Sequence, residues 1–417
     1  MSGGTVHVVG AGLAGLAAAL SLSGSGRSVV LHEAAGHAGG RCRSYLDSTI
    51  GCRIDNGNHL LLSANHAALA YLSEIGASGS LTASAPTFPF QDLPSGLQWT
   101  VRPGEGGLWR RLTAPMRQVP GARAPDALGM VRLAMAGRET TVMQALGPGV
   151  LMERFWRPMT VAILNAEPEI AAARLLRDVM REVIVTGEAT PLTARDGLSE
   201  SFVDPALAVL AVRGVRVGFG RRLRSIELGA DRAVALHFPT DTVDLSSEDW
   251  LVLAVPPQVA AGLLPDLPVP EAASAIVNAH FRLDAPARLS GGGHLMGLTG
   301  GTAQWIFLRG PVASVTVSAA ETLLDRSGEE LASTLWSEIA PVLGLLAAPQ
   351  PPGRIVKEKR ATFRQDPRSL SRRPPARTSW RNLVLAGDWT DTGLPATIEG
   401  AIRSGRQAAD ALSGRAG

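Results

Sequence analysis

The stretch that decides the fold is Val6-His7-Val8-Val9-Gly10-Ala11-Gly12-Leu13-Ala14-Gly15. Residues 6–9 predict a short buried strand, and the alanine- and leucine-rich residues up to about 23 predict a helix. Residues 28–32 predict a second strand, which ends at Glu33. This order of strand, glycine-rich turn, helix and strand is typical of a dinucleotide-binding unit in a parallel sheet.

The glycines and the start of the helix have separate expected roles. Gly10 permits the tight turn, Gly12 lets the backbone approach a pyrophosphate, and Gly15 lets the helix pack on the strand. Leu13 and Ala14 open the helix, where free N–H groups and the positive end of the helix dipole favour phosphate. A glycine-rich turn without this context would be weak evidence.

Three further elements decide which dinucleotide is expected. Glu33 is placed to accept hydrogen bonds from a ribose, and Gly39-Gly40-Arg41 adds a second glycine pair with a cation for the phosphates. Near the end of the chain, Gly387-Asp388 ends a strand and Thr397-Ile398 opens a helix. The acid suits ribityl hydroxyls, and the helix start suits the flavin N1–C2=O region, which becomes anionic on reduction. Asp388 alone would equally fit a helix cap. Together the elements predict FAD, because NAD would need only the first.

Composition narrows the class of protein. Of 417 residues, 45% are hydrophobic and 18% are charged, which excludes disorder for most of the chain. The formal net charge is only +3, so the sequence pI of about 9.3 does not indicate nucleic-acid binding. Two cysteines exclude a disulfide framework and a cysteine-rich metal site, and Cys42 is expected to be a buried structural thiol. No signal peptide or membrane span is expected, so we expect a cytoplasmic protein or one that lies on the inner face of a membrane.

The predicted fold is α/β, with a Rossmann-like FAD-binding domain and a discontinuous α+β substrate domain. Strands are expected at 215–217, 223–228, 234–238 and 250–255, and helices over 128–185. Strands of a second, antiparallel sheet are expected at 275–283, 302–309, 312–318 and 354–362. We assign residues 1–82, 200–268 and 375–417 to the FAD-binding domain, and residues 83–199 and 269–374 to the substrate domain.

The chain resembles the FAD-dependent amine oxidase and phytoene desaturase superfamily over nearly its whole length. Four segments are more narrowly similar to the hydroxysqualene dehydroxylase family of hopanoid biosynthesis. These segments are Ile54-Asp55-Asn56-Gly57-Asn58-His59-Leu60-Leu61-Leu62, Phe155-Trp156-Arg157-Pro158 through Asn165, Lys359-Arg360-Ala361-Thr362-Phe363, and Asn382 through Gly405. The chain departs from that family at Asn58, where glutamine is usual, and at Ser63-Ala64-Asn65, where glycine, alanine and tyrosine are usual.

The resemblance implies reductive removal of the hydroxyl from hydroxysqualene, with hydride from reduced FAD to an allylic carbon and loss of water. Such a reaction needs an apolar tunnel, a donor for the departing oxygen, a dry flavin face and a reductant for FAD. An FAD-dependent desaturase of an isoprenoid or carotenoid lipid would have a similar tunnel and cofactor. An amine oxidase is disfavoured, because Thr397 leads the final helix and the chain has only two tyrosines. A prenyl-lipid carrier without flavin would not need Glu33, Arg41 and Asp388 together.

His59 and Asp391 are the two candidate catalytic residues. In related flavoproteins the Asp55-Asn56-Gly57 turn runs close to the flavin, so His59 could give the leaving hydroxyl a proton or a hydrogen bond. A loop histidine that only orients the backbone, and a turn-forming aspartate at 391, are the alternatives. Glu358 and Lys359 alternate along a strand, so one of them is expected to face the substrate. The full expected set for noncovalent FAD is Gly10, Gly12, Leu13, Ala14, Gly15, Glu33, Gly39, Gly40, Arg41, Gly57, Asn58, Leu223, Gly387, Asp388, Thr397 and Ile398, and no metal site is expected.

Residues 102–138 raise the question of membrane contact. Seven arginines stand there against Glu105 and Asp126. The apolar residues interleaved with them are Trp109, Leu112, Met116, Met130, Leu133 and Met135. The segment could lie on an anionic leaflet from which a lipid substrate enters, or it could be an ordinary solvated face.

Overall fold

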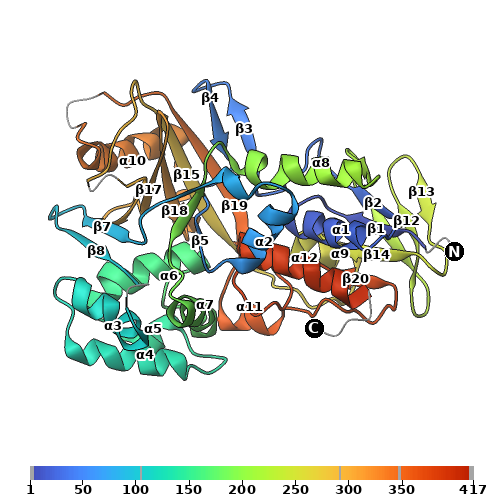
Figure 1. The fold of residues 1–417 in the computed structure, drawn as a ribbon, viewed down its shortest axis with the longest axis horizontal. Coiled ribbons are helices and arrows are strands. Elements are labelled where there is room, and N and C mark those ends of the chain that lie inside the picture. Colours follow the sequence, from blue (N-terminus) through green and yellow to red (C-terminus); the bar gives the residue numbers. More distant parts are fainter. Residues whose placement is uncertain (1–3, 104–105, 291–292, 346–348, 413–417) are drawn as a thin grey trace.

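The computed structural model describes residues 4–103, 106–290, 293–345 and 349–412. Two sheets organise them, and Figure 1 shows one sheet toward each end of the molecule. The first is a five-stranded sheet, and all its neighbouring strands run parallel. Its order is β10 (Arg216–Gly218), β2 (Val29–His32), β1 (Val6–Val9), β14 (Trp250–Leu253) and β20 (Leu383–Leu385).

Helices cover one face of the parallel sheet. Helix α1 (Leu13–Gly24) packs against α12 (Ile398–Leu412), with α8 (Asp204–Val212) and α2 (His66–Glu74) beside them. The approach of α12 to α1 is close, because a Cβ on Gly405 would lie 2.2 Å from the carbonyl oxygen of Ala14. The first and last helices of the chain therefore form one layer on the sheet (Figure 1).

A small antiparallel sheet and a short helix pack on the opposite face. The sheet contains β11 (Ser225–Leu228), β12 (Ala233–His237) and β13 (Thr242–Asp244), and the helix is α9 (Pro257–Leu263). The predicted hairpin is present, although β11 begins at Ser225 rather than at Leu223. The strand expected at 215–217 is present as β10, one residue later, and it is the edge of the parallel sheet.

The second large sheet has seven strands. Its order is β19 (Gly353–Phe363), β15 (Ala273–Arg282), β18 (Val312–Ser318), β17 (Trp305–Arg309), β16 (Leu295–Thr299), β7 (Phe88–Asp92) and β8 (Gln98–Val101). All neighbours run antiparallel except β16 and β7. The strands expected near 275–283, 302–309, 312–318 and 354–362 are present, whereas β16, β7 and β8 were not predicted. The sheet is therefore mixed rather than purely antiparallel.

The two faces of the seven-stranded sheet have different covers. Helix α10 (Gly328–Val342) packs on one face. On the other lies a helical layer (Figure 1). It comprises α3 (Leu108–Gln118), α4 (Ala127–Ala134), α5 (Val142–Leu146), α6 (Arg157–Leu164) and α7 (Ala173–Thr186). None of the described helices is long and apolar enough to cross a membrane. Two small sheets complete the described fold, one of β3 (Ser44–Asp47) and β4 (Cys52–Asp55), the other of β5 (Leu61–Leu62), β9 (Pro191–Ala194) and β6 (Leu81–Ala83).

Candidate functional site

The glycine-rich turn between β1 and α1 has the geometry of a phosphate cradle. Gly10 has φ +106°, and a Cβ there would lie 2.3 Å from the carbonyl oxygen of Ala254. A Cβ on Gly15 would lie 1.8 Å from the carbonyl oxygen of Gly10, so neither position accepts a side chain. Gly12 differs, because nothing stands within 4 Å of its Cβ position. No side chain caps the start of α1 at Gly12. An open backbone beside uncapped N–H groups suits an anionic ligand.

Glu33 stands at the end of β2 and is fixed beside this turn. Its two carboxylate oxygens accept hydrogen bonds from the backbone N–H groups of Ala11 and Ala35, each at 2.7 Å. Each oxygen keeps a second lone-pair position for a ribose hydroxyl. Leu223, which we also expected near the dinucleotide, is buried in the apolar cluster that contains Val9.

The second glycine pair packs directly on the first turn. The N–H of Gly39 donates to the carbonyl of Ala11 at 2.8 Å, and a Cβ on Gly40 would lie 3.4 Å from the Cα of Gly12. Arg41 follows, and its guanidinium lies 2.8 Å from the carboxylate of Asp388 and 2.5 Å from the carbonyl oxygen of Ala361. This carboxylate raises the pKa of Arg41. The ion pair therefore joins an element from the start of the chain to one from its end.

The C-terminal element is a buried loop between β20 and α12. Gly387 has φ +153°, and its N–H donates to the Ser404 hydroxyl on α12 at 2.8 Å. Thr397 caps α12, since its hydroxyl accepts from the N–H of Gly400 at 3.1 Å. Ile398 begins the helix and is buried. The expected flavin-binding residues of this element thus lie at a strand end and at a helix start, as predicted from the sequence.

Arg373 holds this loop in place, and the sequence analysis did not identify it. Its buried guanidinium donates to the carbonyl oxygens of Leu394 at 2.7 Å, Thr390 at 3.0 Å and Asp388 at 3.1 Å. Burial lowers the pKa of Arg373 to about 10, while Asp391 and Asp388 oppose that shift. The only local signal was the pair Arg372-Arg373 before two prolines, which resembles many surface segments.

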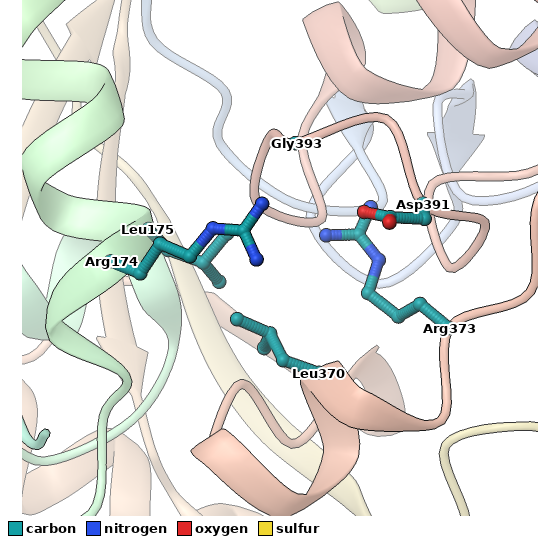
Figure 2. Close-up of a pocket in the computed structure, with 6 residues that line it drawn as sticks. All are labelled: Arg174, Leu175, Leu370, Arg373, Asp391 and Gly393. Atoms are coloured by element: carbon teal, nitrogen blue, oxygen red, sulfur yellow. The ribbon is translucent and has the colours of Figure 1, made fainter. Parts of the chain in front are cut away.

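Asp391 lies on the outer side of the same loop. It is exposed, and its carboxylate stands next to the Arg373 guanidinium in Figure 2. It lines a small cavity of about 30 Å³ together with Arg174 and Leu175 of α7, Leu370 of α11 (Pro367–Ser371), Arg373 and Gly393. Its negative charge opposes the lowering of the Arg373 pKa. Its role as a catalytic residue stays a prediction.

The end of β4 and the loop that follows it contact the seven-stranded sheet. Asp55 is 7% exposed, accepts from the Ser44 hydroxyl at 2.6 Å and forms an ion pair with Arg309 of β17 at 2.5 Å. The Asn56 amide donates to Glu358 of β19 at 3.3 Å. Of the alternating pair on β19, Glu358 therefore faces this loop, whereas Lys359 is exposed.

A short chain of hydrogen bonds continues from Asn58 into the middle of the seven-stranded sheet. The Asn58 amide donates to the Thr316 hydroxyl at 2.9 Å, and that hydroxyl donates to the Asn278 amide oxygen at 2.9 Å. A Cβ on Gly57 would come within 3.3 Å of the Asn278 nitrogen. The Asn58 side chain is thus turned to the sheet, while its backbone and that of Gly57 form the loop that we expect at the flavin.

His59 is half-buried at the end of this loop. Burial lowers its pKa, the Asp55 carboxylate opposes that shift and the Arg41 guanidinium adds to it. Because the pKa is lowered, the neutral imidazole is favoured at neutral pH, so His59 is better suited to donate a hydrogen bond than to act as a permanent imidazolium.

The sheet face opposite α10 is divided into a polar and an apolar half. On β15 and β18 the side chains that point to this face are Asn278, His280, Ser314, Thr316 and Ser318, while the intervening residues pack under α10. Toward β7 and β8 the same face carries the aromatic cluster, which contains Phe88, Phe90, Trp99, Phe155, Trp156 and Trp305. The polar half lies under the loop of Asn58. The alternation Ser314-Val315-Thr316-Val317-Ser318 was the sequence signal for it.

Comparison with known proteins agrees with these features. Residues 13–413 match the model of a family described as flavin containing amine oxidoreductase. The chain is 45% identical over 419 residues to a hydroxysqualene dehydroxylase of Rhodopseudomonas palustris, covering 99% of both chains. It is 24% identical to a 15-cis-phytoene desaturase of Narcissus pseudonarcissus, covering 98% of this chain and 79% of the desaturase. A solved triple mutant of putrescine oxidase has the same fold, with a TM-score of 0.72 at 18% identity and 99% coverage of both chains. The chain therefore belongs to the flavin containing amine oxidoreductases and, within them, to the hydroxysqualene dehydroxylase family.

Proposed function

We propose that the protein removes the hydroxyl group of hydroxysqualene reductively and yields squalene and water, as a step of hopanoid biosynthesis. One observation carries the proposal. The elements expected to hold a dinucleotide meet at the Arg41–Asp388 pair, beside a loop that lies on a sheet face with one polar and one aromatic half. A long hydrocarbon with a single hydroxyl group matches such a face. The 45% identity to a hydroxysqualene dehydroxylase over the whole chain supports the same substrate.

The residues present fit a noncovalently bound FAD. Gly12 and the uncapped start of α1 suit the pyrophosphate, Glu33 suits a ribose, and the start of α12 at Thr397 suits the pyrimidine edge of the flavin. Cys42 is buried and its pKa is strongly raised by burial, which makes it unsuited to covalent attachment. Held by these residues, reduced FAD would supply the hydride that replaces the hydroxyl group at the allylic carbon.

The chain's own residues have three tasks in this reaction. Loss of the hydroxyl as water takes up one proton at its oxygen in addition to the hydride. We assign to His59 the hydrogen bond to that oxygen, and a proton drawn from solvent through the imidazole completes the water. The relay from Asn58 through Thr316 to Asn278 holds the loop so that His59 keeps its position. The aromatic cluster excludes water from the hydrocarbon and from the developing allylic cation.

An FAD-dependent desaturase of an isoprenoid or carotenoid lipid is the second candidate, and the phytoene desaturase relative supports it only distantly. Purified protein with FAD and an excess of dithionite, incubated anaerobically with hydroxysqualene, is expected to form squalene. Absence of squalene, together with a new double bond in squalene under an oxidant, would replace the proposal by the desaturase.

The proposed substrate and cofactor also imply where in the cell the protein works and that it needs a reductant. Because squalene and its alcohol dissolve in lipid, we propose that the protein works in the cytoplasm at the inner face of a membrane. A separate reductant must reduce the oxidised FAD again after each turnover, and we expect a reduced electron carrier of the cell to do so.

A further inference from the structure

We propose that the protein docks in the plane of an anionic lipid bilayer through the exposed face of α4. The inference rests on the proposed function, which requires a lipid-soluble substrate. It goes beyond that function because it names the surface and the lipid charge. Figure 1 shows α3, α4 and α5 gathered at the end of the molecule that lies away from the N-terminus.

Helix α4 is apolar on both faces. Leu133 is buried in the aromatic cluster and Met130 packs against it. On the opposite face, Leu128, Val131 and Met135 are 62%, 55% and 72% exposed. Their spacing of three and four residues puts them in one stripe along the helix. Three exposed apolar side chains on a helix whose other face is buried are normally covered by protein or lipid, and the described part of the chain supplies no such cover.

The exposed stripe differs from the apolar residues that the sequence analysis named as candidates for membrane contact. Leu112, Met116 and Met130 pack inward and Leu133 is buried, so of the apolar residues chosen there only Met135 is exposed among those whose side chains are described. The side chain of Trp109 and the residue Glu105 lie outside the described part. Arg111 is also turned inward, since its guanidinium donates to the carbonyl oxygens of Ile184 and Val185.

Exposed arginines stand on α4, on the neighbouring α3 and in the segments before and after α4. These exposed arginines are Arg110, Arg117, Arg123, Arg132 and Arg138. None of the five has a carboxylate within ion-pair distance in the described part of the chain. Asp126 is the nearest acid along α4, and its carboxylate accepts from the N–H of Arg123. Arg132 lies within the stripe itself, four residues after Leu128. An apolar stripe with a cationic border is the pattern of a helix that lies at the headgroup level of an anionic bilayer.

A second copy of the chain is the competing occupant of this face. An isologous dimer would bring each arginine border against its own copy, which costs like-charge repulsion. A leaflet rich in anionic lipid instead neutralises the same charges. The lipid also gives the arrangement a use, because the inner side of α4 belongs to the aromatic cluster of the proposed substrate site.

The test is co-sedimentation of the FAD-loaded protein with phosphatidylcholine vesicles that contain or lack phosphatidylglycerol. The wild type is expected to bind the anionic vesicles, and to bind roughly tenfold more weakly at high salt or without phosphatidylglycerol. The variant Leu128→Ser/Val131→Ser/Met135→Ser is expected to lose at least about tenfold in binding. Matched controls are Val212→Ser and Leu46→Ser, which change residues that are 90% and 70% exposed elsewhere on the molecule.

Squalene formation in detergent micelles separates this proposal from the proposed function. The triple variant should keep its flavin spectrum and its turnover in micelles. If the wild type turns over in micelles but binds no vesicles, docking is wrong and the function stands. If the wild type binds vesicles through the stripe but forms no squalene in micelles, the proposed function is wrong and docking stands. A dimer in light scattering that the triple variant converts to a monomer, without vesicle binding, would assign the face to a second copy.

Discussion

Replacement of Arg373 by methionine should loosen the loop that we expect at the flavin. Methionine fills much of the same volume but removes the charged donor from all three carbonyl oxygens. The oxygens of Asp388 and Leu394 then have no donor among the described contacts, and that of Thr390 keeps only the N–H of Thr392. The ring of Phe363, whose centre lies 5.3 Å from the guanidinium carbon, would keep an apolar neighbour. The loss is therefore mainly one of hydrogen bonds to buried backbone.

The magnitude follows from two opposing effects. Three buried carbonyls that lose a charged donor cost about 2 kcal/mol each, or about 6 kcal/mol together. The pKa of Arg373, lowered by burial from 12.5 to about 10, indicates that burying the charge costs about 3 kcal/mol, which the neutral side chain recovers. The net destabilisation is then about 3 kcal/mol. FAD affinity should fall as well, because the misplaced loop carries Asp388.

The assay is urea unfolding of the FAD-free protein, combined with titration of FAD by its fluorescence. Arg372→Met is the matched control, since Arg372 lies next in the chain and its ion pair with Glu271 is exposed, which predicts a change below about 1 kcal/mol. Arg373→Lys should fall between the two, because it keeps the charge and loses the fork of donors. Equal stability and equal FAD affinity of the Arg373 and Arg372 methionine variants would refute the reasoning.

Three further predictions concern the turn, the buried histidines and the candidate catalytic residue. Gly12→Ala should leave the stability of the FAD-free protein unchanged and lower FAD affinity by at least about tenfold, whereas Gly15→Ala should fail to fold stably, because its Cβ would lie 1.8 Å from a carbonyl oxygen. Thermal melts and FAD titration check this pair. Burial lowers the pKa of His32 and of His280 from 6.5 to about 4 in the folded protein. Between these two values the histidine is protonated in the unfolded chain but not in the folded one, so the stability falls as the pH drops from 6.5 toward 4. Each of the two histidines should lower the free energy of unfolding by about 2 kcal/mol between pH 7 and pH 5. Urea unfolding of the wild type and of His32→Gln at both pH values measures this, and an equal pH slope in the two proteins would contradict it. His59→Ala should bind FAD normally and form squalene about 100-fold more slowly, and full turnover of this variant would remove His59 from the reaction.

The sequence predicted the parts of the fold that local patterns specify. The strand, turn and helix at Gly10 could be read because glycine positions and helix periodicity are properties of neighbouring residues. The strands β7, β8 and β16 have only four or five residues each, and this is too short for a pattern to identify them. Even the alternating β8 depends on its partners in the sheet for stability.

The sequence indicated the elements that meet at the candidate site, and it indicated their supporting residues less well. Arg41 and Asp388 could each be assigned from a motif, but their ion pair links residues 347 positions apart, and the chain has 40 basic and 37 acidic residues to choose from. Arg373 has no motif at all, since its role depends on which carbonyls the fold brings to it. On α4, apolar residues occur on both faces, so composition could not tell the buried stripe from the exposed one.

The divided face of the seven-stranded sheet explains why one scaffold suits this chemistry. Asn278 and Thr316 place hydrogen-bonding groups on neighbouring strands, directly under the loop that ends at His59. On the next strand, β17, Trp305 stands opposite Thr316 in the register and begins the aromatic half of the same face. An isoprenoid alcohol has one polar atom at the reacting carbon and hydrocarbon on both sides. Such a face can therefore orient the substrate although the substrate carries no charged group. Exchange of Thr316 for valine would break the relay while keeping the shape, and it should raise KM less than it lowers the rate of C–O cleavage.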